Sequence, residues 1–76
     1  MHMKTRTNLK RLRGGQLLTQ HDLADKSGLP FWRVVVIESG RSKPRPVEAR
    51  KLARALGVGV DALGVEVADV APHQPR

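Results

Sequence analysis

The sequence contains no cysteine and no tyrosine, and its aromatic side chains are limited to one phenylalanine and one tryptophan among 76 residues. Without cysteine the chain forms neither a disulfide nor a thiolate metal site. It has no apolar run of about 18 residues to span a bilayer. The N-terminal stretch MHMKTRTNLKR lacks the apolar segment of a secretion signal. These absences predict a cytoplasmic protein that makes no use of a membrane.

Signs of catalysis are also missing. His2, His21 and His73 are not spaced as metal ligands, and the seven acidic residues are scattered along the chain. No glycine-rich phosphate loop follows a strand, and serine, histidine and aspartate form no recognisable catalytic pattern. The sequence therefore predicts a protein that is not an enzyme and that uses no cofactor and no metal ion.

Positive charge, in contrast, is abundant and unevenly placed. The net charge is +7, and all of it lies in residues 1–45, which hold ten Lys/Arg and three acids, whereas residues 46–76 hold four of each. A segregated basic half is typical of a protein that binds a polyanion such as DNA, RNA or an anionic membrane surface. A basic surface kept for solubility is the plainer alternative.

Helix signals divide the first thirty residues. Thr7 is a candidate N-cap for a short helix over residues 8–13, which Gly14 and Gly15 end or fray. Thr19 and Asp22 have the spacing of a capping box, and Leu18 and Leu23 that of a hydrophobic staple. Gly28 supplies a left-handed closing residue. A second helix is therefore expected over residues 20–27.

The stretch GLPFWRVVVIESG, residues 28–40, gives two conflicting signals. Pro30 near its start and Ser39-Gly40 at its end are typical of a helix. The interior residues favour strands, and together they cost a helix about 3 kcal/mol relative to alanine. Burial of Val34 and Ile37 returns about 1.5 to 3 kcal/mol each. A helix is expected here, held by packing.

The second half of the chain continues the helical pattern. A helix is expected from Pro46 up to Gly57, and the short turn VDAL follows Gly59 with Leu63 directed at the core. The fold class is thus all-α, a compact bundle of four to five short helices within residues 1–64. Residues 65–76 form a tail in which Val65, Val67 and Val70 make an edge strand or a dimer contact, and residues 71–76 are expected to be disordered.

Four stretches carry a family resemblance: LKRLR, TQHDLADKSGL, ESGRSKP and KLARALGVGVDAL. They resemble, without gaps over residues 9–63, the Cro and phage-repressor class of helix-turn-helix domains. The resemblance implies a lambda-repressor-like fold whose helix-turn-helix motif covers about residues 19–40. It also implies a cytoplasmic homodimer that regulates transcription on double-stranded DNA, with the helix after Pro30 in the major groove and half-sites about 34 Å apart.

Site residues follow from the resemblance by position. Gln20 would bind a DNA phosphate, Arg41 and Lys43 match a loop that meets the DNA backbone, and Arg13 and Glu38 match a structural ion pair. The further phosphate contacts that we expect are Arg33 on the helix after Pro30 and Lys4 and Arg6 in a basic N-terminal arm.

The chain departs from the family at the residues that would read bases. Phe31, Trp32 and Val36 stand where polar side chains are usual, and Pro30 replaces a Ser/Thr cap. If Val34 and Ile37 face the core, Trp32 and Val36 lie about 160° to 200° from Val34 and face outward, flanked by Arg33 and Val35.

An outward apolar face on this helix allows several functions. Phe31, Trp32, Val35 and Val36 would face the groove and contact thymine methyl groups, wedge at a base step or stack on an unpaired base. A protein-interaction module that uses the same face to bind a partner protein is the alternative. Binding of RNA or single-stranded DNA is a third hypothesis.

Overall fold

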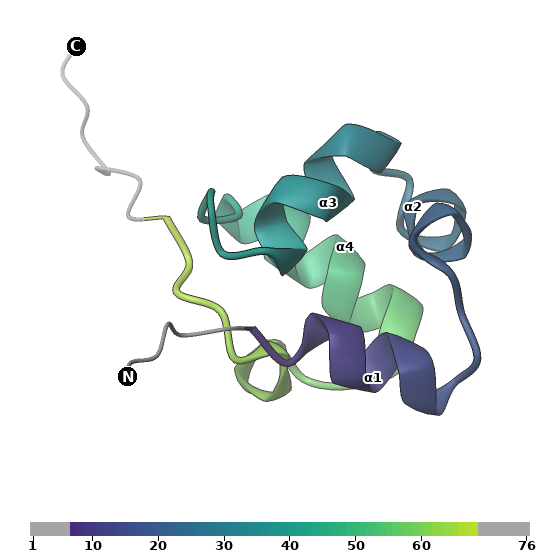
Figure 1. The fold of residues 1–76 in the computed structure, drawn as a ribbon. Helices are drawn as coiled ribbons and strands as arrows, with labels where there is room; N and C mark the ends of the chain where they lie inside the picture. The colour runs from purple at the N-terminus through teal and green to yellow at the C-terminus, as the bar shows by residue number, and fades with distance from the viewer. Residues whose placement is uncertain (1–6, 69–76) are drawn as a thin grey trace, which may run out of the picture.

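The computed structural model describes residues 7–68, and the regular structure in this range is entirely helical, as the sequence predicts. The elements are α1 (Leu9–Gly15), α2 (Gln20–Ser27), α3 (Phe31–Glu38), α4 (Pro46–Leu56) and the 3₁₀ turn η1 (Val60–Leu63). In Figure 1 α4 runs through the middle of the molecule, with α1, α2 and α3 arranged around it. No helix within residues 7–68 has the length and apolar character to cross a bilayer.

A single apolar cluster holds the helices together. Every helix contributes at least one side chain to it, so that α4 is covered on several sides. The fully buried or nearly buried members are Leu9, Leu23, Ala24, Leu29, Val34, Ile37, Ala49, Leu52, Ala53, Leu56 and Leu63. With so many short helices sharing one core, none depends on its intrinsic propensity alone.

The start of α2 has the structure that the sequence predicts. The Thr19 hydroxyl accepts the Asp22 backbone N–H at 3.0 Å, and the Asp22 carboxylate accepts the Thr19 N–H at 2.8 Å. The hydrogen bond that the Thr19 N–H donates to the carboxylate is the main cause that lowers the pKa of Asp22. At the other end Gly28 closes the helix with φ of 79°. The reciprocal cap places Gln20 at the first position of the helix, where it faces α3.

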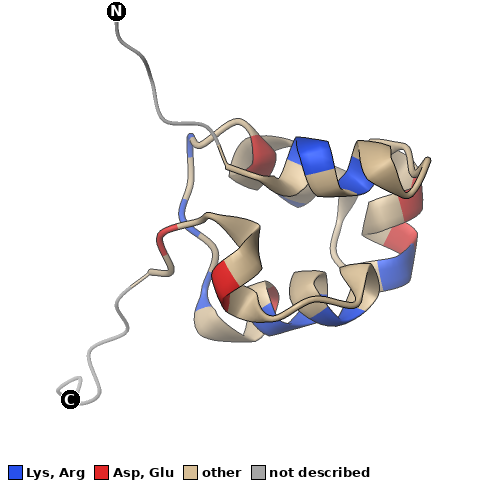
Figure 2. Ribbon diagram, turned by 90° about the horizontal axis from the view of Figure 1, so that it is seen from below, with Lys and Arg blue, Asp and Glu red and all other residues tan. Residues whose placement is uncertain are grey.

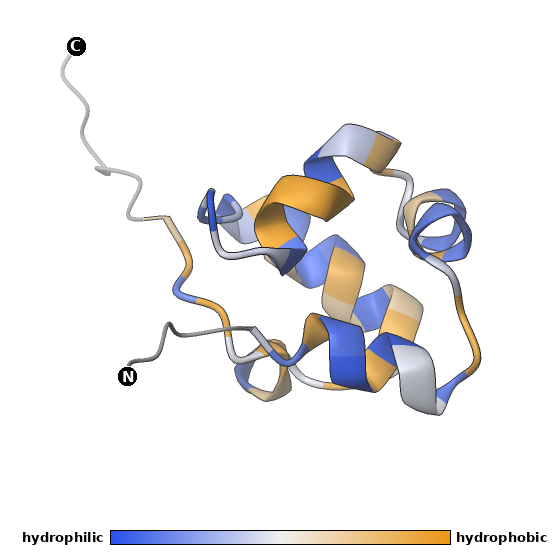
Figure 3. Cartoon of the chain, viewed as in Figure 1, coloured by the Kyte–Doolittle hydropathy of each residue, from blue (hydrophilic) through white to orange (hydrophobic). Residues whose placement is uncertain are grey.

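The conflicting stretch 28–40 folds as a helix. Val34 and Ile37 are fully buried, and their burial offsets the poor helix propensity of this β-branched segment. Pro30 occupies the N-cap position without a side-chain cap bond. Figure 3 shows the C-terminal half of α3 as strongly hydrophobic, on both its inner and outer sides.

α1 differs from its prediction at both ends. The N-cap is Asn8, and the Thr7 hydroxyl accepts the Leu9 N–H at 3.3 Å from one residue further out. The helix also continues through Gly14 and Gly15, because contacts on either side hold it: Arg13 is tied to α3, and the Gln16 amide donates to the Leu56 carbonyl at 2.7 Å.

The second half closes the core as expected. Pro46 begins α4, Gly57 ends it with φ of 71°, and Leu63 of η1 is fully buried. Residues 64–68 form no strand. Val65 and Val67 instead pack beside the core, and the Ala68 N–H donates to the Pro44 carbonyl at 2.7 Å. The expectations for Val70 and for residues 71–76 lie outside the described residues.

Candidate nucleic-acid interface

α2 and α3 are consecutive helices that pack against each other as a helix-turn-helix. The left-handed Gly28 turns the chain, and Leu29 buries itself before α3 begins. The small Ala24 of α2 is 5% exposed, and α2 packs against α3. Apolar side chains on the core side therefore hold the motif together, and the opposite side of α3 faces solvent.

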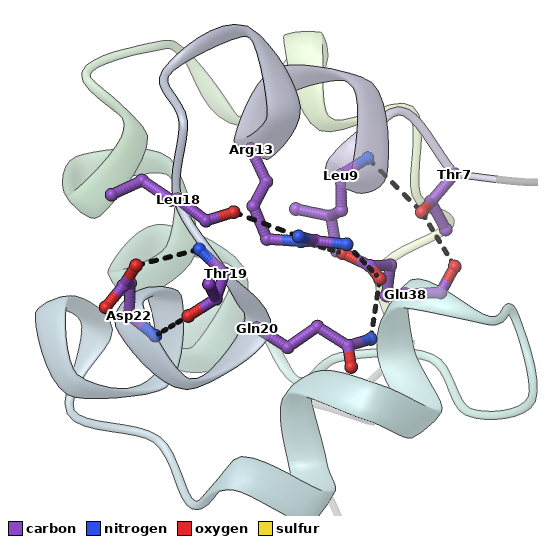
Figure 4. A network of polar contacts seen from close by, with 8 residues as sticks. All are labelled: Thr7, Leu9, Arg13, Leu18, Thr19, Gln20, Asp22 and Glu38. Atoms are coloured by element: carbon purple, nitrogen blue, oxygen red, sulfur yellow. Dashed lines mark hydrogen bonds and ion pairs between the residues drawn. The ribbon is translucent and has the colours of Figure 1, made fainter.

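A polar network joins α1, α2 and the end of α3 (Figure 4). The Arg13 guanidinium donates from Nε to Glu38 Oε2 at 2.7 Å and from Nη2 to Oε1 at 3.0 Å. The two side chains are 14% and 7% exposed, so the ion pair is largely removed from water. The hydrogen bond to Glu38 raises the pKa of Arg13. The ion pair expected from the sequence is thus present.

Gln20 belongs to the same network. Its Nε2 donates to Glu38 Oε1 at 2.7 Å, which leaves the amide with one further hydrogen for an outside partner. The Thr7 hydroxyl donates to the Glu38 backbone carbonyl at 3.0 Å. Glu38 is therefore a structural acceptor for three segments of the chain, and the orientation of Gln20 toward α3 is fixed from within the protein.

Arg33 has a different place from the one expected. Its Nε and Nη2 donate to the two carboxylate oxygens of Glu48 at 2.9 and 2.8 Å, and Nη1 donates to the Ser42 hydroxyl at 2.7 Å. Nη2 also reaches the Lys43 carbonyl at 3.1 Å. The side chain is 15% exposed, and the hydrogen bond to Glu48 raises the pKa of Arg33 and lowers that of the carboxyl. Arg33 thus ties α3 to α4, and a phosphate contact from it conflicts with these bonds.

The outward side of α3 is apolar, as the helical register predicts. Trp32 is 62% exposed, and its ring centroid lies 6.0 Å from the Arg33 guanidinium carbon. Phe31 is 39% exposed and stacks on His21 of α2, with ring centroids 3.8 Å apart and planes 5° from parallel. The Phe31 ring is therefore held by its stack on His21, whereas most of the Trp32 side chain is open to solvent.

The two valines of this face are less exposed than the aromatic residues. Val35 and Val36 are both half-buried, and Val36 packs beside the core. The expectation that Val36 faces outward together with Trp32 is therefore wrong in part, because its side chain packs partly against the core while Trp32 stays exposed.

Cationic residues lie on several helices and in the loop that joins α3 to α4 (Figure 2). Arg41 and Lys43 lie in the loop after the helix and are exposed, and Lys43 pairs weakly with Glu66 at 3.7 Å. Lys4 and Arg6 lie outside the described residues, so their expected role stays a prediction. Within residues 7–68 no three histidine or acidic side chains gather as a metal site.

Two contacts of this candidate interface were not predicted from the sequence. Glu48 holds Arg33, and it also accepts the Arg45 N–H at 2.8 Å at the start of α4. An acid three residues after a helix start is a sequence signal that points to this second bond. The stack of His21 on Phe31 has no comparable signal, because its partners come from two helices.

Comparison with known proteins agrees with this geometry. The helix-turn-helix family model matches residues 9–63, most of the chain. A search of curated protein sequences gives no match. The chain belongs to the Cro and phage-repressor class of the helix-turn-helix family, and it is a DNA-binding transcriptional regulator.

Among solved structures, the chain is similar to the restriction-modification controller protein C.AhdI from Aeromonas hydrophila. The two share 36% sequence identity with a TM-score of 0.71, over 74% of this chain and 85% of the controller protein. The likeness thus spans nearly all of that protein.

Proposed function

We propose that this regulator binds double-stranded DNA by placing α3 in the major groove. The observation that carries the proposal is the solvent-exposed outer face of α3, where Trp32 is 62% exposed, on a helix that the family uses for recognition. Exposed Arg41 and Lys43 at the end of this helix supply the charge that draws the groove and its phosphates toward it.

Base reading by this face is chiefly apolar. Phe31, Val35 and Val36 carry no hydrogen-bonding side-chain group, and Trp32 carries a single N–H. The feature of the major groove that suits apolar side chains is the C5 methyl group of thymine. The protein therefore selects half-sites by the positions of thymines under Trp32 and Phe31.

Phosphate contacts come from the edges of the motif. Arg41, Lys43 and the second amide hydrogen of Gln20 are available to the DNA backbone, and Lys4 and Arg6 extend the same basic half of the chain. Arg33 is excluded from this set because its charge is paired with Glu48 and four of its five N–H donors bond inside the protein. Two copies on one duplex would read half-sites about 34 Å apart, so the active form is a homodimer.

The test starts from selection of random duplex DNA by the protein, which yields the site and its symmetry. Binding is then followed by the fluorescence of Trp32, the only tryptophan. We expect affinity that falls steeply with salt and one homodimer per site by sedimentation. Absence of binding to any duplex at about 50 mM salt contradicts the proposal, because electrostatic attraction is strong there.

The proposed contact of α3 with thymine methyl groups is tested separately. Replacing thymidine by deoxyuridine removes the methyl group and leaves every hydrogen-bonding atom in place. Each contacted methyl should cost about fourfold in affinity, from about 0.8 kcal/mol per buried carbon. The variant Trp32→Ala should lose this discrimination at the thymines under Trp32 and keep it at those under Phe31. Equal binding of both sites by the unaltered protein contradicts apolar reading.

A protein-interaction module is the second candidate function, favoured by the same exposed Trp32. It predicts that Trp32→Ala abolishes capture of the partner protein while Arg41→Ala and Lys43→Ala change little. DNA binding predicts that the two cation variants weaken binding to all duplexes and reduce its dependence on salt. The two functions are therefore separated by one set of variants.

A further inference from the structure

A hollow of about 690 Å³ opens beside α3 on the side away from Arg33. Its walls come from three elements: Lys10 and Arg11 of α1, Gln20 at the start of α2, and Val35, Glu38 and Ser39 at the end of α3 and just after it. Thr7, Gln20 and Glu38, which are labelled in Figure 4, mark its position next to the polar network. The hollow thus borders the helix that we place in the groove.

The charge of this hollow favours an anion. Glu38, the acid on its wall, is already paired with Arg13 and accepts a further bond from Gln20. Lys10 and Arg11 are exposed and form no ion pair with any residue of the range 7–68. With the carboxylate neutralised, the two free cations set the sign of the hollow.

The position of the hollow indicates where the anion comes from. Val35 is three residues, about one turn, after Trp32, so the hollow lies along the flank of the exposed face. When a helix lies in the major groove, the sugar-phosphate strand at the groove edge runs along that flank. The volume lies within the range of ligand pockets and exceeds what a lone ion needs, and Val35 offers an apolar contact to a sugar.

We propose that this hollow seats a backbone phosphate of the bound DNA, with its deoxyribose, and that Lys10 and Arg11 are the cationic ligands of that phosphate. The inference rests on the proposed function, since it requires a duplex on α3. It adds α1 to the phosphate-binding surface, at residues that lie outside the helix-turn-helix motif. The free amide hydrogen of Gln20 is a further donor facing the seat.

The experiment measures duplex affinity against salt for Lys10→Gln and Arg11→Gln, singly and together. The matched control is Lys51→Gln with Arg54→Gln, which removes the same charge from exposed positions of α4 outside the hollow. Loss of one phosphate contact lowers the slope of log K against log salt by about 0.9. The double variant loses one such contact at each half-site of the homodimer, so its slope should fall by about 1.8 and its affinity at 0.1 M salt by about sixtyfold, alike for all sequences. An unchanged slope, or an equal loss in the control pair, overturns the proposal.

Neutral methylphosphonate linkages, introduced one at a time into the selected duplex, locate the phosphate. The unaltered protein should lose affinity at one particular linkage of each half-site, and the double variant should be insensitive to that same linkage. Equal sensitivity of both proteins at every linkage contradicts the seat. Saturable binding of inorganic phosphate at Lys10 and Arg11, with duplex affinity unchanged in the double variant, would assign the hollow to a small anion and overturn the DNA seat. Failure of the proposed function is a separate result, namely that the unaltered protein binds no duplex.

Discussion

Replacing Glu38 with alanine should bring the domain to the edge of unfolding. The carboxylate accepts two bonds from Arg13 and one from Gln20, and the pair is largely buried, with side-chain exposures of 14% and 7%. Removing one partner of a buried ion pair costs about 3 to 5 kcal/mol, because the other charge stays buried without compensation. A domain of this size has a total free energy of unfolding of about 3 to 9 kcal/mol.

The size of the effect comes from the unpaired charge more than from the bond itself. The Arg13→Met variant should therefore destabilise by a similar amount, since it leaves Glu38 with the Gln20 amide as its side-chain partner. The double variant Arg13→Met with Glu38→Ala removes both charges and should recover most of the loss. The cycle should give a coupling free energy of about 3 kcal/mol or more.

The assay is urea unfolding of the four proteins followed by circular dichroism at 222 nm. The exposed pair of Lys43 with Glu66, 3.7 Å apart, is the control, and Lys43→Met should change stability by less than about 1 kcal/mol. If the Arg13 and Glu38 variants each lowered the free energy of unfolding by less than about 1 kcal/mol, and these effects were additive, the buried ion pair would contribute no more than the exposed one. That result would refute the reasoning from burial.

Three further predictions concern stability. Leu17 has φ of 59° with its side chain 89% exposed, so Leu17→Gly relieves a backbone strain of about 1 to 2 kcal/mol. The flexibility that glycine adds to the unfolded chain offsets part of this gain, and the variant should raise Tm by a few degrees in a thermal melt. A lower Tm contradicts the strain. The hydrogen-bonded guanidinium of Arg33 lowers the pKa of Glu48 below the ordinary 4.5. The Glu48 carboxylate therefore stabilises the fold above pH 4.5, and this stabilisation is lost as the pH falls through the lowered pKa. Urea titrations from pH 7 to pH 3 should therefore show a weaker acid dependence for Glu48→Gln, and an unchanged dependence excludes this source. Gly64→Ala places a Cβ 2.7 Å from the Asn8 amide nitrogen, whereas Gly57→Ala meets nothing within 4 Å at a similar φ. The first should therefore destabilise more than the second, and equal losses would exclude the clash.

The parts of the fold that follow from local signals could be predicted from the sequence. The capping box at Thr19 and the left-handed Gly28 fix the two ends of α2, and both signals act within a few residues. The helical register of Val34 and Ile37 likewise predicts that Trp32 faces outward. The glycines after Arg13 misled the prediction for α1, because the contacts that extend the helix come from distant segments.

The candidate site was harder to predict because its polar side chains form hydrogen bonds with residues of other helices that are distant in the sequence. Arg33 lies beside the outward apolar face of α3 in the sequence register, and nothing local indicates that Glu48, fifteen residues away, pairs with it. Gln20 is at the expected helix start, yet its amide is held by Glu38 from α3. Charge near a motif therefore predicts affinity for an anion better than it predicts which cation is free to bind one.

Because Glu48 holds Arg33, the outward side of α3, which we propose enters the major groove, carries no free charge, and this would affect how the protein searches DNA. On a random sequence the cations at the edges can engage the backbone while the apolar face stays hydrated and contributes little. On its own site the face becomes dehydrated, which produces a negative heat-capacity change that the random complex lacks. Because apolar attraction weakens on cooling, discrimination between the site and random DNA should decline toward low temperature while attraction to the DNA backbone persists.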